Sequence, residues 1–382
     1  MEYRSLGKTG LKASEISFGA EWLEGKSTEE AIELVSFCES KGINLLDCWM
    51  SEPKVRSNIG IAIKDSREKW IIQGHIGSTW QNNQYVRSRD MDKVIESFED
   101  QMERLNTDYL DFGMIHYVDE VSEFESIMDG EFFKYVKELK NKGIIHHIGL
   151  STHNTDVALI ATEYEEIELI MFSINPAYDM LQSMTLEETR EENRFDDDLN
   201  GIDPKRDNFY QICDEKNIAI TVMKGFAGGT LLKDETSPFG VALTSVQCIE
   251  YALSRPGVSS ILVGVHNVSE MADCLKYETA TDKEKDYVSI LLDAPYHSYK
   301  GQCTYCGHCS PCSSEINIVM VNKYYDLAKV HSQIPKSIQG HYDDLTFNAS
   351  DCTYCEECEP RCPFNVKIAE KMFEINKFFG EN

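Results

Sequence analysis

Eight cysteines near the C-terminus form two closely spaced runs. The first run contains Cys303, Cys306, Cys309 and Cys312, and the second contains Cys352, Cys355, Cys358 and Cys362. The second run has the spacing C-x2-C-x2-C-x3-C-P, which places three thiolates on one cubane iron–sulfur cluster and the fourth on another. Because the two runs together supply enough thiolates for both, the sequence predicts two [4Fe–4S] clusters.

The exchange of fourth ligands also predicts how the cysteines divide between the clusters. One cluster would take Cys303, Cys306, Cys309 and Cys362, and the other Cys352, Cys355, Cys358 and Cys312. The first run departs slightly, with one residue fewer before its fourth cysteine. Zinc and disulfides are the alternatives. Zinc sites rarely use three cysteines at successive x2 spacings, and disulfides suit a secreted chain, of which the sequence gives no sign.

A second group of reactive side chains ends short apolar runs in the N-terminal three quarters of the chain. These side chains are Asp47, His75, His116, Ser151, Asn175 and Lys224. Carboxylates and imidazoles transfer protons, and hydroxyl and amide groups hold polar ligands. The alternative explanation is that polar residues simply return wherever a strand ends.

The elements that would position these side chains alternate between strand and helix. Strands are predicted at residues 16–19, 43–47, 70–75, 109–116, 147–151, 169–175, 218–224 and 260–264. Helical periodicity marks residues 28–41, 91–105, 132–142 and 268–277. The alternation predicts a parallel sheet with crossover helices. Eight such units close into a (β/α)8 TIM barrel, whose chemistry lies at the carboxyl ends of its strands.

The chain is therefore predicted to hold two domains. Residues 1–295 form the barrel, ending in a helix at 281–292, and residues 296–382 form a mainly helical ferredoxin-like domain that binds the clusters. The connection at 176–207 is long and acidic. Long loops of this kind serve as lids or binding loops or are disordered, and an acidic one could also dock a redox partner.

The charge and hydropathy of the chain exclude some classes of binding partner. The net charge of −28 over 382 residues argues against nucleic acid, whose phosphates would be repelled. No apolar stretch approaches the roughly 20 residues that span a bilayer, and the N-terminal sequence does not read as a signal peptide. We expect a cytoplasmic protein of an anaerobe that acts on a small molecule and exchanges electrons with a ferredoxin-like carrier.

Several stretches resemble the aldo-keto reductases, in particular the branch with a C-terminal ferredoxin-like extension. The most specific stretch is 105–116, and the others are 3–12, 42–47, 142–151 and 255–264. The resemblance implies reduction of a carbonyl with NAD(P)H. It also implies a tetrad in which a tyrosine protonates the carbonyl oxygen, a lysine paired with an aspartate lowers the pKa of that tyrosine, and a histidine orients the substrate.

Only half of this tetrad is retained. Asp47 and His116 match the family's aspartate and histidine, whereas Glu52 stands at the tyrosine position and His75 at the lysine position. A tyrosine donates a proton at neutral pH, but a glutamate is normally ionised. Glu52 would donate only where burial or Asp47 keeps it protonated, and His75 is the alternative acid. The four side chains are predicted to form a proton-transferring set; a pocket that has lost its chemistry is the alternative.

The nicotinamide-binding positions implied by the resemblance are also altered. Ser151 is followed by Thr152 instead of asparagine, and Asn175 ends the next strand. Met171 and Met223 replace a glutamine and a ring-stacking tyrosine. These changes weaken the expected hold on the nicotinamide ring.

The phosphate cradle implied by the resemblance lies at the N-terminus of the last barrel helix. Its residues are Gly264, Val265, His266 and Asn267. Glu270 aligns with the family's adenine-side arginine and would repel a 2′-phosphate, so NADH is favoured over NADPH. Cys274 replaces an asparagine on the same helix.

Three functions remain open from the sequence. The first is an NADH-dependent reductase of a carbonyl or related small molecule that carries two clusters. The second is a cluster-fed reductase without nicotinamide, because a hydride carrier and a one-electron cluster exchange electrons only through an intermediary such as a flavin. The sequence has no flavin-binding fingerprint, but a barrel flavin site need not carry one. The third is a non-catalytic electron-transfer protein on a reductase scaffold.

Overall fold

The computed structural model describes residues 1–181, 202–237, 239–292, 303, 309, 311–329, 333–362 and 366–380. The chain divides into two compact units. The first comprises Met1–Asn175, Lys205–Phe226 and Thr244–Tyr287, and the second Pro176–Pro204, Ala227–Leu243 and Val288–Asn382. The acidic stretch within the predicted 176–207 loop lies largely outside the described residues.

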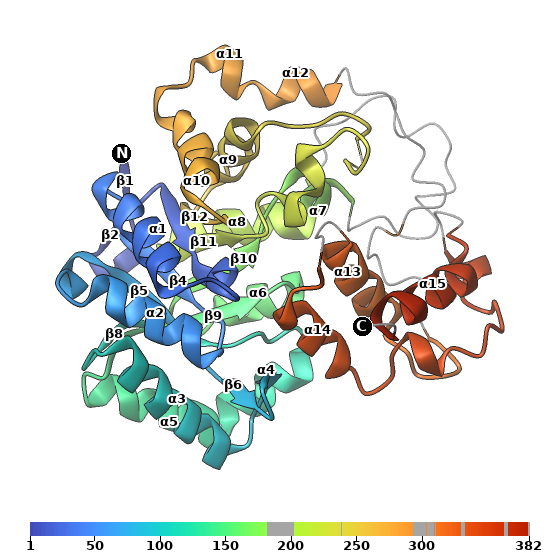
Figure 1. Ribbon diagram of the computed structural model, residues 1–382, viewed down its shortest axis with the longest axis horizontal. Coiled ribbons are helices and arrows are strands. Elements are labelled where there is room, and N and C mark those ends of the chain that lie inside the picture. Colours follow the sequence, from blue (N-terminus) through green and yellow to red (C-terminus); the bar gives the residue numbers. More distant parts are fainter. Residues whose placement is uncertain are drawn as a thin grey trace. The chain divides into compact units, whose positions relative to one another are not determined.

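Parallel strands of the first unit close into a barrel in the order β10-β11-β12-β3-β4-β5-β8-β9 (Figure 1). Their bounds are β3 Ile16–Gly19, β4 Leu45–Cys48, β5 Ile71–Ile76, β8 Leu110–Ile115, β9 Ile145–Thr152, β10 Ile167–Ser173, β11 Ala219–Met223 and β12 Val258–Gly264. Each corresponds to one predicted strand, so the (β/α)8 prediction is confirmed. Every residue of β5, β8 and β10 is buried, as expected for parallel strands covered on both faces.

Two β-hairpins of the first unit were not predicted from the sequence. β1 (Tyr3–Ser5) pairs with β2 (Lys12–Ser14), and β6 (Ser78–Gln81) pairs with β7 (Gln84–Arg87). Both pairs are antiparallel and lie outside the barrel sheet. The second hairpin follows β5 directly and therefore starts at the carboxyl end of the barrel.

Helices lie between the barrel strands and after the last of them. They are α1 Thr28–Ser40, α2 Pro53–Ile63, α3 Met91–Leu105, α4 Val121–Asp129, α5 Glu131–Asn141, α6 Thr155–Ala161, α8 Pro204–Lys216, α9 Ser245–Leu253, α10 Val268–Leu275 and α11 Asp282–Lys285. Local sequence sets several boundaries. Ser27 and Glu30 form a capping box at the start of α1, and Asn106 adopts a left-handed conformation that ends α3.

The barrel interior is filled mainly by apolar side chains. The buried cluster includes Leu45, Phe112, Met114, Leu169, Met171, Met223 and Leu262. One polar bridge crosses it, because Gln73 Nε2 of β5 donates to Thr221 Oγ1 of β11 at 3.0 Å. The packed interior holds the strands in register and so fixes the side chains at their carboxyl ends.

The described part of the second unit is mainly helical. Its helices include α7 Pro176–Leu181, α13 Ile318–Ala328, α14 Lys336–Asp343 and α15 Ile368–Gly380. The sequence predicts helices at residues 319–330, 333–339 and 366–379. α13 and α15 correspond to the first and last of these, and α14 begins within the second. The single helix predicted at 281–292 is wrong, because Asp286 has a ψ of 90° and separates α11 from α12 (Tyr287–Leu292). The ferredoxin-like character of this region and the 295/296 boundary stay predictions.

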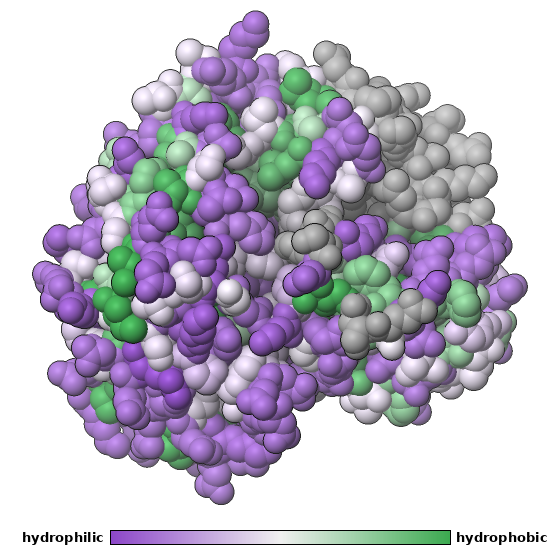
Figure 2. All heavy atoms as spheres, viewed as in Figure 1, coloured by the Kyte–Doolittle hydropathy of each residue, from purple (hydrophilic) through white to green (hydrophobic). Residues whose placement is uncertain are grey.

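The face shown in Figure 2 is predominantly hydrophilic, with hydrophobic residues in small separate patches. This distribution agrees with the strongly acidic composition. Among the described helices, none has both the length and the apolarity needed to cross a bilayer.

Candidate active site and cysteine cavity

Three of the predicted catalytic side chains meet at the carboxyl end of the barrel. Asp47 lies in β4, His75 in the adjacent β5, and His116 directly follows β8, which pairs with β5. His75 Nε2 lies 2.9 Å from Asp47 Oδ1, and the Nδ1 atoms of His75 and His116 are 2.8 Å apart. Asp47 and His75 are 1% exposed and His116 is 4% exposed. The strands therefore bring the three groups into one buried hydrogen-bonded chain.

The β6–β7 hairpin adds a fourth member that the sequence reasoning missed. Tyr85 of β7 is buried, and its hydroxyl lies 2.7 Å from His116 Nε2. Asn82 and Asn83 form the two-residue turn with φ values of 53° and 63°, the conformation that asparagine tolerates in tight hairpins. This Asn-Asn pair was the available signal, because it predicts a hairpin and hence a side chain folded back over the strand ends.

Aromatic rings enclose this chain of polar groups. Trp49 stacks on His116 with a centroid separation of 5.9 Å, and its ring meets Tyr85 edge-on at 5.3 Å. The ring centroids of Tyr117 and His116 are 6.1 Å apart, and Tyr117 has a positive φ of 47°. Arg89 Nη2 donates to the carbonyl oxygen of His116 at 2.6 Å. These contacts fix the orientation of the His116 imidazole.

The hydrogen bonds have a definite direction when both imidazoles are neutral. An ionised Asp47 only accepts, so His75 Nε2 carries a proton and His75 Nδ1 accepts from His116 Nδ1. His116 Nε2 then accepts from the hydroxyl of Tyr85. Burial raises the pKa of the neighbouring Cys48 thiol to about 12, so this thiol stays neutral and takes no part. The arrangement can carry a proton along its length.

Glu52 is not joined to this chain in the described part of the structure. It precedes α2, and its side chain does not cap the helix. Its Oε2 atom is buried without a hydrogen-bond partner among the described residues. The four residues predicted to share one set are therefore brought together only in part: Asp47, His75 and His116 are linked, and Glu52 stands apart from their hydrogen bonds.

The side chains predicted to hold the nicotinamide have mixed surroundings. Ser151 is buried at the end of β9. Thr152 Oγ1 donates to Asp119 Oδ1 at 3.2 Å and accepts from the backbone N–H of Asn154, so its hydroxyl is already used. Asn175 Nδ2 donates to the carbonyl oxygen of Lys224 at 2.9 Å.

Met223, predicted to stand where a ring-stacking tyrosine would be, is 7% exposed and belongs to the barrel cluster. A thioether in that position can pack against a flat ring but cannot match the stacking of an aromatic side chain. The surroundings of this predicted position are thus more apolar than the resemblance implies.

The predicted phosphate cradle contains an internal carboxylate. Asn267 caps α10 by accepting from the N–H of Glu270 at 3.0 Å. Glu270 in turn accepts from the N–H of His266 at 2.7 Å and from Asn267 Nδ2 at 3.1 Å. Gly264 and Val265 precede this turn. The ring centroids of His266 and Trp22 are 4.5 Å apart. One backbone donor that an anion would use at a helix N-terminus is therefore taken.

A carboxylate at this helix N-terminus bears on the choice between NADH and NADPH. A ribose 2′-phosphate at this end of α10 would place a second anion beside the Glu270 carboxylate. A ribose hydroxyl can instead donate to a carboxylate, which is the role of acidic residues in other dinucleotide-binding folds.

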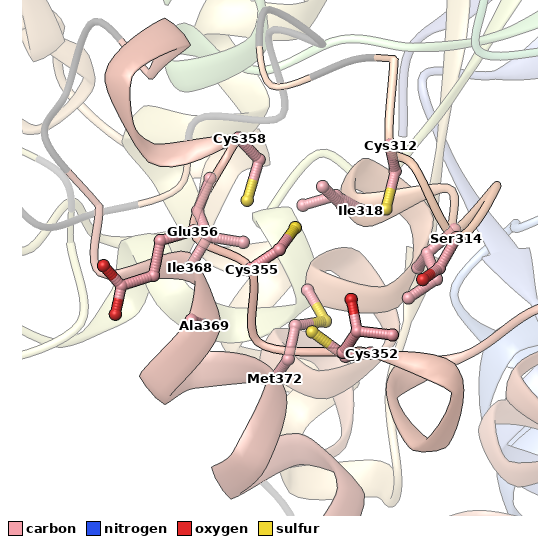
Figure 3. A pocket seen from close by; sticks show the side chains of 12 residues that line it. Cys312, Ser314, Ile318, Cys352, Cys355, Glu356, Cys358, Ile368, Ala369 and Met372 are labelled. Carbon is pink, nitrogen blue, oxygen red and sulfur yellow. The ribbon is translucent and has the colours of Figure 1, made fainter.

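In the second unit, four cysteines line one cavity. They are Cys312, Cys352, Cys355 and Cys358, accompanied by apolar side chains that include Ile318, Ile368 and Met372 (Figure 3). These are the four cysteines that the exchange of fourth ligands assigned to one cluster. Ser313 Oγ lies 3.5 Å from Cys355 Sγ. The hydrogen bond with Ser313 lowers the pKa of Cys355, whereas burial raises the pKa of Cys358 to about 11.

The other cysteine set is only partly described. Cys303, Cys309 and Cys362 lie within the described residues, and Cys306 lies outside them. Arg361 Nη2 donates to the carbonyl oxygens of Cys309 and Pro311 at 2.9 and 2.6 Å. This arginine, next to Cys362, ties the second cysteine run to the first.

No group of three His, Cys, Asp or Glu side chains in the described part of the chain stands ready to hold a single metal ion. A cubane cluster makes a different demand, because each cysteine binds its own iron and the four thiolates need not converge on one atom. The cavity offers cysteine side chains, the ligand type that a cubane cluster requires.

Taken together, the closed parallel barrel and its polar carboxyl end define a (β/α)8 enzyme scaffold. Residues 15–242 match the model of the Aldo/keto reductase family. This chain belongs to the aldo/keto reductase family, and its fold and family indicate an oxidoreductase.

Individual relatives are more distant. Aldo-keto reductase YhdN of Bacillus subtilis (strain 168) is 31% identical over 166 residues, which cover 41% of this chain and 48% of the relative. NADH-specific methylglyoxal reductase of Escherichia coli (strain K12) is 24% identical over 179 residues, covering 44% of this chain and 54% of the relative. The chain thus spans about half the length of each of these two relatives.

Solved structures agree on the fold. Aldo-keto reductase AKR11C1 from Bacillus halodurans, in its holo form, superimposes with a TM-score of 0.60 at 20% identity, covering 78% of this chain and 98% of that one. At this identity the similarity shows the shared barrel and nothing finer.

Proposed function

We propose that this protein reduces the carbonyl group of a small molecule with NADH, using the buried Asp47–His75–His116 chain as its proton-handling centre. The observation that carries the proposal is this chain of hydrogen bonds at the carboxyl ends of three neighbouring strands, in a member of the aldo/keto reductase family. Barrel enzymes place their chemistry at this end.

NADH is the reductant that the residues favour. Bound NADH would supply a hydride to the carbonyl carbon. Glu270 at the start of α10 would accept a hydrogen bond from a ribose hydroxyl and repel a 2′-phosphate, and Ser151 offers a hydroxyl to the carboxamide. The Escherichia coli relative, which is named an NADH-specific methylglyoxal reductase, supports the same cofactor and suggests small carbonyl compounds as the first substrates to test.

The protein's own groups handle the proton that accompanies the hydride. Asp47 holds the Nε2 proton of His75 in place, which leaves His75 Nδ1 facing His116. His116 Nε2 thereby faces the hydroxyl of Tyr85. General acid catalysis of this kind typically contributes about 10²–10⁴-fold to a rate.

We also propose that the C-terminal cysteines bind two [4Fe–4S] clusters in a ferredoxin-like domain at residues 296–382. One cluster would be held by Cys312, Cys352, Cys355 and Cys358, which share a cavity. The other would be held by Cys303, Cys306, Cys309 and Cys362, with Arg361 tying the two runs together. The clusters would pass electrons or stabilise the fold.

A second candidate is a cluster-fed reductase that takes electrons from a ferredoxin-like carrier without nicotinamide. It is favoured by one observation, that Glu270 already accepts from the His266 N–H at the phosphate cradle. A barrel-bound flavin would then be needed to convert single electrons into a hydride equivalent.

Turnover by the full-length protein, purified without oxygen, tests the proposal. Iron content and cluster absorbance are measured first, and NADH oxidation is then followed with methylglyoxal and a panel of small aldehydes and ketones. Carbonyl-dependent oxidation of NADH is the expected result. Reduction of these compounds by reduced ferredoxin but not by NADH would favour the second candidate.

A further inference from the structure

We propose that Tyr85 is the catalytic proton donor of the barrel, and that His116 and His75 resupply its proton; this inference rests on the reductase activity proposed above. The Tyr85 hydroxyl is 2.7 Å from His116 Nε2, and this bond extends the chain that begins at Asp47. Tyr85 comes from the β6–β7 hairpin, not from the position after β4 where the resemblance expects a tyrosine.

Two proton arrangements are compatible with the same heavy-atom geometry. In the neutral arrangement, Tyr85 donates to His116, His116 to His75, and His75 to Asp47. When the imidazole pair gains one proton, the His75–His116 and His116–Tyr85 hydrogen bonds reverse direction. His75 Nδ1 then donates to His116 Nδ1, and His116 Nε2 donates to the oxygen of Tyr85. The phenolic proton is then released from its bond to His116 and can be directed at a substrate.

The reaction step balances in this scheme. The carbonyl carbon accepts a hydride from NADH, so a C–H bond forms, the C=O π bond breaks, the carbonyl is reduced and NADH is oxidised. The substrate oxygen takes the phenolic proton of Tyr85. The His116 Nε2 proton moves to the Tyr85 oxygen, and the His75 Nδ1 proton moves to His116 Nδ1. One hydride and one proton are consumed, and the neutral arrangement returns.

His116 is placed to return a proton to Tyr85. The Tyr85 side chain is 1% exposed, and its hydroxyl contacts His116 Nε2. Hydrogen bonds in such a buried network strengthen one another. Arg87 and Arg89 each interact electrostatically with Tyr85, and their positive charges favour the negative charge that develops on the phenol as it donates.

Glu52 is the competing donor, and its geometry is weaker. Its carboxylate makes no hydrogen bond to Asp47, His75 or His116 in the described part of the chain, and one oxygen is buried without a partner. A donor without a link to the imidazole pair would have to be reprotonated by another route. Tyr85 therefore accounts for the paired histidines better than Glu52 does.

The Tyr85→Phe variant of the full-length protein tests the assignment in single-turnover reduction with NADH. We expect the rate to fall at least about 100-fold, while the dissociation constant of NADH stays within about two-fold. Tyr135→Phe is the matched control, because Tyr135 lies in α5 and packs against Phe98; it should retain the wild-type rate. A Tyr85→Phe variant within about three-fold of wild type would overturn the assignment.

Two further measurements do not depend on the turnover of the variant. In ¹⁵N-histidine-labelled protein, Tyr85→Phe should shift the His116 Nε2 resonance, and an unmoved resonance would show that the bond is absent. In the wild-type protein, the reduction rate can be measured against the fraction of D2O in the solvent. A curved plot is expected because several protons move together, and a linear plot would contradict the relay. A wild-type protein inactive with every carbonyl contradicts the proposed function, whereas equal activity in wild type and Tyr85→Phe contradicts only the role of Tyr85.

Discussion

The barrel site and the cysteine cavity hold their reactive groups in different ways. Asp47, His75 and His116 project from paired strands and are linked directly by hydrogen bonds. The four cavity cysteines come from irregular segments and share a space, with the Ser313–Cys355 contact as the side-chain hydrogen bond recorded among them in the described residues. The barrel site is therefore organised by the backbone, whereas the proposed cluster would fix the ligands of the cavity.

This difference predicts that damage to either site leaves the other largely intact. A barrel variant should lose its chemistry and keep its iron. A cavity variant should lose iron and keep its affinity for NADH. The following variants test that independence.

Asp47→Asn should have the largest effect. An amide in place of the carboxylate no longer fixes the proton on His75 Nε2, so the direction of the whole hydrogen-bonded chain is lost. We expect kcat for NADH-dependent carbonyl reduction to fall about 10³-fold, with iron content unchanged. An equal loss of iron would contradict the independence of the two sites.

Asp111→Asn is the control for Asp47→Asn. Asp111 is also a buried strand aspartate, but its carboxylate accepts from the backbone N–H of Ile72 and from Arg67. This variant should lower the melting temperature and leave kcat at the wild-type value.

Cys355→Ser should remove one of the two proposed clusters. Serine is a poor ligand for iron compared with a thiolate, so we expect iron per chain to fall by about half, measured by chemical analysis and electron paramagnetic resonance. NADH affinity should not change. Cys213→Ala, which alters a buried thiol of the barrel unit, should retain full iron content; unchanged iron in Cys355→Ser would contradict the proposed ligand set.

Glu168→Gln should have the smallest effect and report on the barrel alone. Burial acts to raise the pKa of Glu168, but hydrogen bonds from His147 and Lys140 outweigh it and lower the pKa from 4.5 to about 2. The ionised carboxylate thus stabilises the fold above pH 4.5, and this stability is lost as pH falls from 4.5 toward 2. We expect unfolding at pH 7 to become easier by about 2 kcal/mol, with a smaller difference at pH 3. An equal difference at both values would contradict the ion pair.

Most strands of the barrel could be predicted from the sequence because continuous apolar runs identify buried parallel strands. The residues at their ends, Asp47, His75 and His116, were found for the same reason. Tyr85 was not, because its role depends on a hairpin that folds back over the strand ends, and a tyrosine within β7 has no periodicity that marks a site. The Asn82–Asn83 turn was a local signal for that hairpin.

Other differences between the predictions from sequence and the structure arise from tertiary contacts. Glu52 occupies the sequence position of the family's tyrosine, yet proximity along the chain did not bring it into the hydrogen-bonded set. The helix expected at 281–292 has helical periodicity throughout, but Asp286 leaves the helical conformation. For the cysteines, spacing predicted the set that lines the cavity, because short x2 spacings restrict where a thiol can reach.

A calorimetric titration shows whether the barrel uses NADH despite its altered tetrad. Full-length protein purified without oxygen is titrated with NADH and with NADPH, alongside Glu270→Gln. We predict that NADH binds at least about tenfold more tightly than NADPH, a difference of about 1.4 kcal/mol, and that Glu270→Gln narrows this gap. Failure of either dinucleotide to bind, or tighter binding of NADPH, would contradict the account.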